Sequence, residues 1–570
     1  MRKLAALAVL AIAVAAPASA QDFKRVVPKV PPVPPPPSVD TPASPAPAST
    51  DQTVLIPELK GVIFIGTPDA VQPDGVAPEA VAGGVSASGL PLMETPNFTA
   101  RVRAYLGKPL TRAGLDALAQ IAREAFRAGG RPFLDVSVPQ QKVQSGVVQL
   151  LVTEYRLGAV DVTGNRHFST RLIRGMGDLK SGEPLTLARL RKALDDYNQN
   201  PFLTISAVAS PGSATGETDL TLEAKDRLPL RVYAGYDNQG TPLLGRDEWY
   251  VGANWGNVLG TGQILSYQFT RSFKRRYTSH SASDVLPLGP DDRFLLFGAY
   301  ATQKPDLGPI FDSEGHSGQV SARWAHDLPG SPSVKHSLQI GVDYKRTDNN
   351  LDFLGFRILK SDVELFQIPV TYSGTFIDGG GRTVVEATWI FSPGDVTPHN
   401  NDAALNLLVP FSDATYGYGR ISATRTTFLP TGISWIVRGM FQAATGNLPN
   451  SEQLGGGGIG SVRGYDPNTA LGSEGVLLST ELRSPAFSLL GKKIDDQLQL
   501  GLFVDYARLW QPTPYPDLPH HDELASVGFN INYSVGRYLD LQLQLGSQLI
   551  RAPFETERKT RAAVIATIGF

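Results

Sequence analysis

The stretch Leu539-Asp540-Leu541-Gln542-Leu543-Gln544-Leu545 decides the fold class of this chain. Its four leucines alternate with three polar residues, and successive side chains of a β-strand point to opposite faces. The stretch is therefore a strand with one apolar and one polar face. Two explanations are open: a soluble sandwich that buries the apolar face, or a transmembrane barrel that turns this face to lipid and lines a lumen with the polar one.

The same two-faced pattern recurs elsewhere in the second half of the chain. Leu498 to Tyr506 has apolar residues at its even positions, with Phe503 and Asp505 among the odd ones. Val527 to Val535 alternates likewise, and Val564 to Phe570 alternates up to a terminal aromatic residue. Segments of about 9 to 11 residues suit tilted membrane strands, and a closed barrel has no exposed sheet edge. The pattern therefore favours the transmembrane barrel.

The N-terminus indicates export from the cytoplasm. Residues 1–20 combine a basic start, an apolar run of 13 residues and Ala18-Ser19-Ala20, the small-residue pattern of a signal-peptide cleavage site. No later apolar run reaches the length of about 18 residues that indicates a membrane helix. The chain has no cysteine, which excludes disulfides, thiolate metal sites and cysteine nucleophiles. Its net charge of -2 argues against a nucleic-acid partner.

A proline-rich segment, residues 21–51, follows the signal peptide. It holds ten prolines between Pro28 and Pro47, a composition that forms extended polyproline II and builds no core. We interpret this segment as a spacer. A ligand for a proline-binding recognition domain is the alternative, and it is disfavoured outside the cytoplasm.

A repeated unit lies between the spacer and the barrel. Gly107-Lys108-Pro109-Leu110-Thr111 recurs 75 residues later as Gly182-Glu183-Pro184-Leu185-Thr186, and each copy opens an amphipathic helix with threonine as N-cap. Flanking strands complete the order strand, helix, helix, strand, strand, which predicts two small α+β modules with three-stranded sheets. The first module carries an insertion of about 22 residues within 67–97, to which the sequence assigns no role. The predicted boundaries are 52–157 and 158–228 for the modules and 229–570 for the barrel.

One loop of the barrel has an unusual composition. Glycines from Gly455 to Gly460 precede Ser461-Val462-Arg463-Gly464-Tyr465, and Phe503-Val504-Asp505 lies about forty residues later. Strands counted back from Phe570, with the C-terminus taken as periplasmic, place this loop at the outer face. The alternation places Asp505 on the lumen face, so an arginine on a flexible loop and an aspartate on the wall suggest a latch inside a cavity.

These features together resemble the outer-membrane transporters of two-partner secretion, of the hemolysin-activator and hemagglutinin-exporter type. The most specific strings run from Ser451-Glu452-Gln453 through the arginine loop to Glu481-Leu482-Arg483-Ser484-Pro485. Pro139-Gln140, Gly146-Val147-Val148 and Glu154 match in the first module. The resemblance covers nearly the whole mature chain.

The resemblance implies two periplasmic polypeptide-transport-associated (POTRA) modules before an antiparallel transmembrane barrel of sixteen strands, an even number as in other bacterial barrels. It implies that the arginine loop folds into the lumen. Val462, Arg463, Gly464 and Tyr465 then form a gating motif, and Arg463 approaches the wall residues Phe503 and Asp505. Members of this family often begin with a helix that plugs the barrel, but here only Gln21 to Val27 precede the prolines, so a plug helix is not expected. The spacer or the loop would narrow the pore instead.

The function implied is a pore in the Gram-negative outer membrane that recognises a large exoprotein in the periplasm and moves it unfolded to the cell surface. Its expected partners are that exoprotein, bound by the POTRA modules, and membrane lipid. The alternatives are a barrel-assembly insertase of the same superfamily, which generally has more modules than residues 52–228 can hold, and a passive porin, which needs no modules. The sequence identifies neither the exported protein nor the oligomeric state.

No catalytic residue, metal site or cofactor is expected. Gly455, Gly457 and Gly460 satisfy G-x-G-x-x-G, but no strand-to-helix unit surrounds them. His520-His521-Asp522 lacks further metal ligands, and no motif sets a nucleophile beside a base. The sequence does not predict an enzyme.

Overall fold

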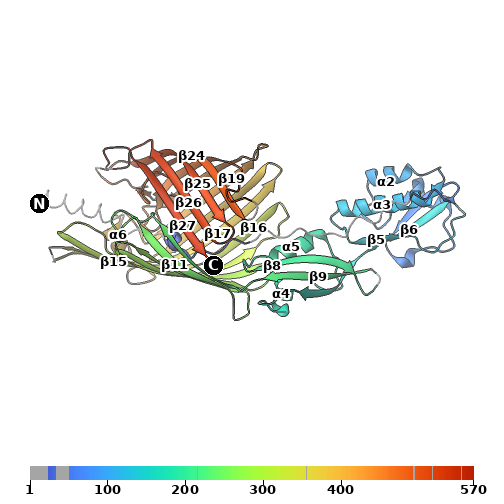
Figure 1. The fold of residues 1–570 in the computed structure, drawn as a ribbon, viewed down its shortest axis with the longest axis horizontal. Coiled ribbons are helices and arrows are strands. Elements are labelled where there is room, and N and C mark those ends of the chain that lie inside the picture. The colour runs from blue at the N-terminus through green and yellow to red at the C-terminus, as the bar shows by residue number, and fades with distance from the viewer. Residues whose placement is uncertain are drawn as a thin grey trace. The chain divides into compact units, whose positions relative to one another are not determined.

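The computed structural model describes residues 23–33, 50–214, 216–354, 356–491, 494–516, 518–553 and 555–570. The predicted signal peptide, residues 1–20, and most of the predicted proline-rich spacer lie outside the described residues. The chain divides into two compact units (Figure 1). One runs from Val33 to Leu228, and the other joins Pro229 to Phe570 with the N-terminal segment through Pro32.

The first unit contains both predicted modules. The first module consists of β2 (Gly61–Ile65), α2 (Pro96–Arg103), α3 (Arg112–Ala128), β5 (Leu134–Ser137) and β6 (Val147–Glu154), with a small pair of β1 (Val54–Ile56) and β4 (Leu110–Thr111) beside them. The second consists of β7 (Arg156–Thr163), α4 (Thr170–Met176), α5 (Leu187–Tyr197), β8 (Leu203–Pro211) and β9 (Glu217–Asp226). The predicted order of strand, helix, helix, strand, strand is confirmed in both.

Threonine caps start the longer helix of each module. The Thr111 side chain accepts the backbone N–H of Gly114 at α3, and the Thr186 side chain accepts that of Arg189 at α5. Each cap satisfies one of the N–H groups that a helix N-terminus leaves free. Both helices then bury one apolar face on their sheet, so the repeated sequence motif marks the same structural point twice.

The insertion in the first module changes its sheet. The segment contains the turns η2 (Pro68–Ala70), η3 (Pro78–Ala80) and η4 (Ala82–Gly84), followed by the short strand β3 (Val85–Ser86). β3 pairs in parallel with β2, which gives a four-stranded sheet of order β3-β2-β6-β5. Val76 and Val81 pack on Val147. The prediction of a three-stranded sheet is therefore wrong for this module, and holds for the second, whose order is β7-β9-β8.

The second unit is a closed antiparallel barrel of sixteen strands, as predicted. Its strands are β10 (Leu230–Asp237), β11 (Glu248–Val258), β12 (Gln263–Ser272), β13 (Tyr277–Pro287), β14 (Asp292–Gln303), β15 (Phe311–Asp327), β16 (Val334–Phe353), β17 (Phe356–Asp378), β18 (Gly381–Pro393), β19 (Thr415–Phe428), β20 (Ser434–Ala444), β23 (Glu474–Arg483), β24 (Asp496–Trp510), β25 (His521–Val535), β26 (Leu539–Gln548) and β27 (Thr560–Gly569). A helix, α6 (Asp402–Leu408), lies between β18 and β19. Among the described residues, no helix is long and apolar enough to cross a membrane.

Side-chain alternation gives the barrel wall its two faces. On β24, Leu502 is 66% exposed, whereas its neighbour Phe503 is 2% exposed. Leu502 stands opposite Phe529 of β25, and Asp505 stands opposite Ser526. Apolar residues therefore meet apolar residues on the outer face, while Asp505 and Ser526 share the inner face, which is the arrangement the alternation predicts.

The N-terminal segment occupies part of the lumen. Phe23–Val26 forms the turn η1, and Phe23 and Val26 pack in one cluster with Tyr277 and Ala301 on inward positions of β13 and β14. The Arg25 guanidinium donates to the Glu248 carboxylate at 2.5 Å. The start of the predicted spacer is therefore attached to the inner wall, which agrees with the expectation that the spacer or the loop narrows the pore.

Further hydrogen bonds continue along this segment. The Ser281 hydroxyl donates to the carbonyl of Val26 at 2.5 Å, the backbone N–H of Lys29 donates to the Tyr233 hydroxyl at 2.9 Å, and Arg231 donates to the Lys29 carbonyl at 3.1 Å. The partners all stand on strands β10 to β13, so the segment follows one wall of the barrel.

Candidate functional site

The glycine-rich loop between β20 and β23, residues 445–473, folds back onto the inner wall of the barrel. Within it, β21 (Leu454–Gly456) pairs with β22 (Ala470–Gly472). We call this hairpin with its flanking residues 445–453 and 473 the stem, and residues 457–469 the tip. Leu454 and Ala470 pack on Leu509 and Leu524, which face inward from β24 and β25. The stem is thereby an inner layer against the wall.

The tip places Arg463 on two buried carboxylates. Its guanidinium donates to Asp505 through Nε at 2.7 Å and Nη2 at 2.8 Å, and its backbone N–H donates to the same carboxylate at 3.0 Å. A further nitrogen, Nη1, donates to Glu481 of β23 at 2.7 Å. Arg463 is 5% exposed, Glu481 1% and Asp505 0%. The structure therefore brings together the arginine and the aspartate that the sequence singled out.

Phe503 forms the floor of this arrangement. The centre of the Arg463 guanidinium lies 3.5 Å from the centroid of the Phe503 ring. A guanidinium over the face of an aromatic ring gains a cation–π attraction that is strongest where water is excluded. Its donors lie in the plane of the group, so stacking leaves them free for the carboxylates. One wall strand, β24, thus supplies both the stacking surface and a carboxylate.

Glu481 is a site residue that the sequence analysis did not single out. It also accepts from Arg483 at 2.6 Å and from Arg438 at 3.4 Å, so three guanidiniums surround it. Charges removed from water are stable only when paired and hydrogen-bonded. The position of Glu481 in the string that carries the family resemblance is a signal that could have indicated it, but its pairing with Arg463 depends on how far the loop reaches down the wall.

Gly464 brings the tip backbone directly onto the barrel wall. It has φ +93°, and a Cβ at Gly546 of β26 would lie 2.6 Å from the Gly464 backbone nitrogen. A Cβ at Gly528 of β25 would likewise lie 2.6 Å from the Phe503 ring. Glycine therefore serves both the left-handed conformation of the tip and the close approach of the two backbones.

Tyr465 and Val462 fix the two sides of the tip. The Tyr465 hydroxyl lies 2.8 Å from the carbonyl of Ala525 and 2.5 Å from that of Ile550, and it accepts the Ala525 N–H at 3.2 Å. Val462 is fully buried in the cluster with Leu509 and Leu524. The four motif residues Val462 to Tyr465 thus each make a different contact with the wall.

The tip also reaches the strands that close the barrel. Asp466 accepts from Arg246, at 2.9 Å, and lies 3.0 Å from Arg561 of β27. Arg561 also donates to the Tyr465 carbonyl at 2.6 Å and to the Asn238 carbonyl at 2.8 Å. These contacts connect the tip to β27 and to the segment after β10. The ladder between β10 and β27, which closes the barrel, has five residue pairs.

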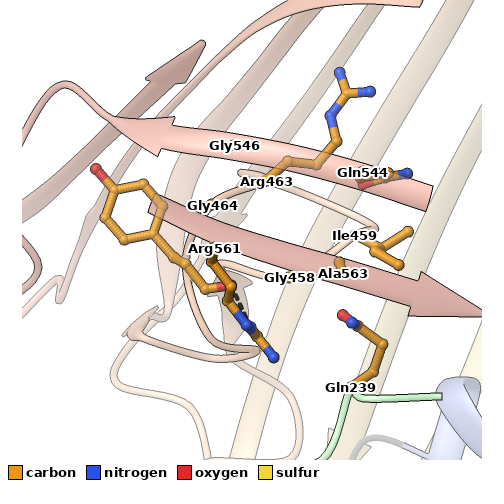
Figure 2. Close-up of a pocket in the computed structure, with 10 residues that line it drawn as sticks. Gln239, Gly458, Ile459, Arg463, Gly464, Gln544, Gly546, Arg561 and Ala563 are labelled. Atoms are coloured by element: carbon orange, nitrogen blue, oxygen red, sulfur yellow. Dashed lines mark hydrogen bonds between the residues drawn. The ribbon is translucent and has the colours of Figure 1, made fainter. Parts of the chain in front are cut away.

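The cleft beside the tip does not resemble a ligand site. Figure 2 shows the side chains of Arg463 and Arg561 pointing away from each other, with Gly464 beside Gly546 between them. The cleft is too narrow for a water molecule or a small ligand. No cluster of three or more metal-binding side chains occurs in the part of the chain that the structure describes. The geometry is that of a packed contact between a loop and a wall.

Comparison with protein families identifies relatives of both units. A family described as haemolysin secretion/activation protein ShlB/FhaC/HecB matches residues 216–532. A second family, described as POTRA domain, ShlB-type, matches residues 83–154. The first match spans more than half of the chain, and the second falls in the first α+β module.

Individual proteins give the same result. The heme/hemopexin transporter protein HuxB of Haemophilus influenzae is 23% identical over 71% of this chain and 71% of its own length. The outer membrane transporter CdiB-2 of Burkholderia pseudomallei is 25% identical over 75% of this chain and 73% of its own. Among solved structures, CdiB from Escherichia coli has the same fold, with a TM-score of 0.70 and 18% identity over 93% of each chain.

Proposed function

This chain belongs to the ShlB/FhaC/HecB family of haemolysin secretion/activation proteins, and from that premise we propose that the loop of residues 445–473 is the gate of its pore. The protein is an outer-membrane transporter of the two-partner secretion type, with its POTRA modules in the periplasm. The relatives are transporters, and this favours secretion over barrel assembly. The proposal concerns how the exported chain is received and admitted.

The periplasmic modules receive the exported protein as an extended chain. An extended segment adds to a free sheet edge through backbone hydrogen bonds, which tolerate varied side chains. The second module offers β8, an edge strand of nine residues. The edge strand β5 of the first module has only four residues, and β3 covers the opposite edge of that sheet. The edge strand β8 of the second module is therefore better suited to pair with an exported chain than either edge of the first module.

The contact of Arg463 with Asp505 and Glu481 is the observation that carries the gate. It holds the tip against the inner wall with all three charged groups out of water, and loss of one partner of a buried ion pair costs about 3–5 kcal/mol. A tip that leaves the wall must therefore separate a buried ion pair. The closed position is therefore stable until an exported chain competes for the lumen. Folding of that chain outside the cell then makes transport directional without ATP.

Substitution of the arginine tests the gate. In Arg463→Ala, the tip can no longer return to its position on the wall, so we expect a leakier pore and lower export of the partner protein while the folded barrel remains in the membrane. The matched control is Arg346→Ala, which removes an arginine that is half exposed and pairs with Asp362 on the barrel. Normal export by Arg463→Ala at a normal barrel level would rule the gate out.

Depletion of the transporter tests the assignment to secretion. Loss of one secreted protein, encoded for instance by a neighbouring reading frame, is the expected result. A general loss of outer-membrane proteins would instead indicate the insertase.

A further inference from the structure

The gate loop has a second buried attachment, at its stem. The Glu452 side chain is 1% exposed. It accepts hydrogen bonds from the Lys345 ammonium at 2.7 Å, from the Tyr418 hydroxyl at 2.8 Å and from the Ser451 hydroxyl at 2.8 Å. Lys345 and Tyr418 stand on β16 and β19. This wall is different from the one that holds Arg463, whose partners stand on β23 and β24.

The backbone of the stem is fixed on the same side. The carbonyl of Glu452 accepts from Gln442 at 3.1 Å and from Arg420 at 3.3 Å. Gln442 also donates to the carbonyl of Ser473 at 2.9 Å, and the Ser473 hydroxyl accepts the N–H of Leu448 at 2.7 Å. One wall glutamine and one serine thus join the entering and leaving strands of the loop.

The point at which the stem ends is marked in the backbone. The hairpin pairs residues up to Gly456 with Ala470, and the next two residues, Gly457 and Gly458, have φ values of +109° and +86°. Glycine in this region rotates at little steric cost. The loop therefore consists of a hydrogen-bonded stem and a tip, with two glycines at their junction on one side whose backbone N–H groups donate only to tip residues, Ser461 and Tyr465.

We propose that Glu452 is a positioning residue that keeps the stem on the wall while the tip is released, so that the gate is a flap hinged at Gly457 and Gly458. This inference rests on the proposed function of the loop and adds that only residues 457–469 leave the lumen wall during export. The stem stays in place and returns the tip to Asp505 after each passage.

The absence of cysteine from the chain allows a clean test of stem movement. A Cβ at Gly456 would lie 3.7 Å from the Cβ of Ala507 on β24, which is within the range of about 3.5–4.5 Å found in disulfides. The nearest obstacles to that Cβ are terminal Cδ atoms of the buried Leu509 and Leu524, at 2.9 and 3.0 Å, and a small rotation of these side chains is needed to admit it. The pair Gly456→Cys and Ala507→Cys is therefore suited to locking the stem to the wall.

The locked transporter separates a hinged flap from a loop that leaves as a whole. The double variant is folded in the outer membrane, oxidised with copper phenanthroline, and compared with the same sample after reduction. Equal export before and after reduction is the expected result. Export that is lost on oxidation and restored by reduction would overturn the inference. Heat-modifiable migration of the folded barrel in gels verifies that both samples are folded.

The substitution Glu452→Gln tests the attachment itself. It leaves Lys345 without its carboxylate, so the stem loosens and we expect loss of export with a leakier pore. The oxidised disulfide between positions 456 and 507 should restore export to Glu452→Gln, and reduction of the already folded protein should remove it again. The matched control is Asp343→Asn, which removes a buried lumen carboxylate that pairs with Arg323 at 2.7 Å on the wall alone.

The outcomes distinguish this inference from the gate itself. Wild-type export by Glu452→Gln, or a failure of the disulfide to rescue it, would contradict a positioning role for Glu452. Normal export by Arg463→Ala would remove the gate on which the inference rests. If Arg463→Ala abolishes export and the oxidised stem also blocks it, the gate stands and only the fixed stem is wrong.

Discussion

Two segments of this protein enter the barrel lumen, and each places an arginine on a buried carboxylate. In the gate loop, Arg463 is 5% exposed and binds both Asp505 and Glu481. In the N-terminal segment, Arg25 is 33% exposed, donates to Glu248 at 2.5 Å and lies 4.0 Å from Asp237. Arg463 lies 3.5 Å from an aromatic ring centre, whereas Arg25 lies 5.7 Å from that of Tyr277.

The two segments in the lumen are therefore attached to the barrel wall with different strengths. The gate tip has its second carboxylate within hydrogen-bond distance, at 2.7 Å compared with 4.0 Å for Arg25 and Asp237, and it also has a closer ring and a glycine that lets its backbone contact the wall. The N-terminal segment has one short turn of four residues and a few backbone hydrogen bonds. We therefore expect the N-terminal segment to leave the lumen more readily than the tip.

The largest effect should come from Asp505→Ala. It leaves the Arg463 guanidinium buried with one of its two carboxylates missing, and breaking a buried pair destabilises by about 3–5 kcal/mol. We expect a lower free energy of unfolding for the barrel in urea and loss of export. Asp362→Ala is the control, because its partner Arg346 is half exposed and ion pairs that water reaches contribute about 0–1 kcal/mol. Equal stability of the two variants would contradict the special strength of the tip contact.

A smaller effect is expected from Gly546→Ala on the wall beneath the tip. The new Cβ would lie 2.6 Å from the Gly464 nitrogen, so the tip must rise, and such overpacking costs about 1–3 kcal/mol. Channel conductance in planar bilayers should increase because the tip no longer seats. Gly439→Ala on β20 is the control, since its Cβ would meet only a Leu478 side chain at 3.7 Å. Unchanged conductance in Gly546→Ala would show that the backbone contact does not hold the tip.

The weaker attachment is tested by Arg25→Ala. It removes the hydrogen bond that the Arg25 guanidinium donates to the buried Glu248 carboxylate. Because Arg25 is one-third exposed, water reaches the carboxylate once this side chain is removed, and we expect a loss of about 1–2 kcal/mol. Conductance should rise while barrel stability in urea stays close to wild type. A loss of stability as large as that of Asp505→Ala would make the two lumen segments equivalent and end the distinction between them.

The sequence alone predicts the contacts of the gate loop better than those of the N-terminal segment. Strict alternation on β24 places Asp505 and Phe503 on the inner face, and the motif around Arg463 indicates its counterpart. Glu481 was missed because its pairing depends on the depth to which the loop descends. Gly546 was missed because a close approach of two backbones leaves no mark in local periodicity.

The N-terminal segment and the insertion show where such reasoning stops. Residues 23–32 have no helical or strand periodicity, and their partners stand about 200 residues or more away, as with Arg25 and Glu248. Composition alone therefore indicated a spacer. Similarly, β3 has two residues, too few for a pattern, and it is recognised only by its parallel pairing with β2. The local sequence pattern was sufficient to predict the helices and strands. Contacts between residues far apart in the sequence could be identified only from the three-dimensional structure.

The smallest effect is expected from mild acid. A measurement at mildly acidic pH tests whether protonation of Glu452 releases the stem. Burial alone would raise the pKa of Glu452, but the Lys345 ammonium and its hydrogen bonds lower it to about 2. A carboxylate with a folded pKa below its ordinary value of 4.5 contributes its stabilisation fully above that ordinary value, and loses it only as the pH falls through the folded pKa, near 2. Conductance and loop position should therefore be unchanged between pH 7 and pH 5. Opening of the wild-type pore in that range, absent in Lys345→Gln/Glu452→Gln, would show that the stem carboxylate is far less strongly held than its partners imply.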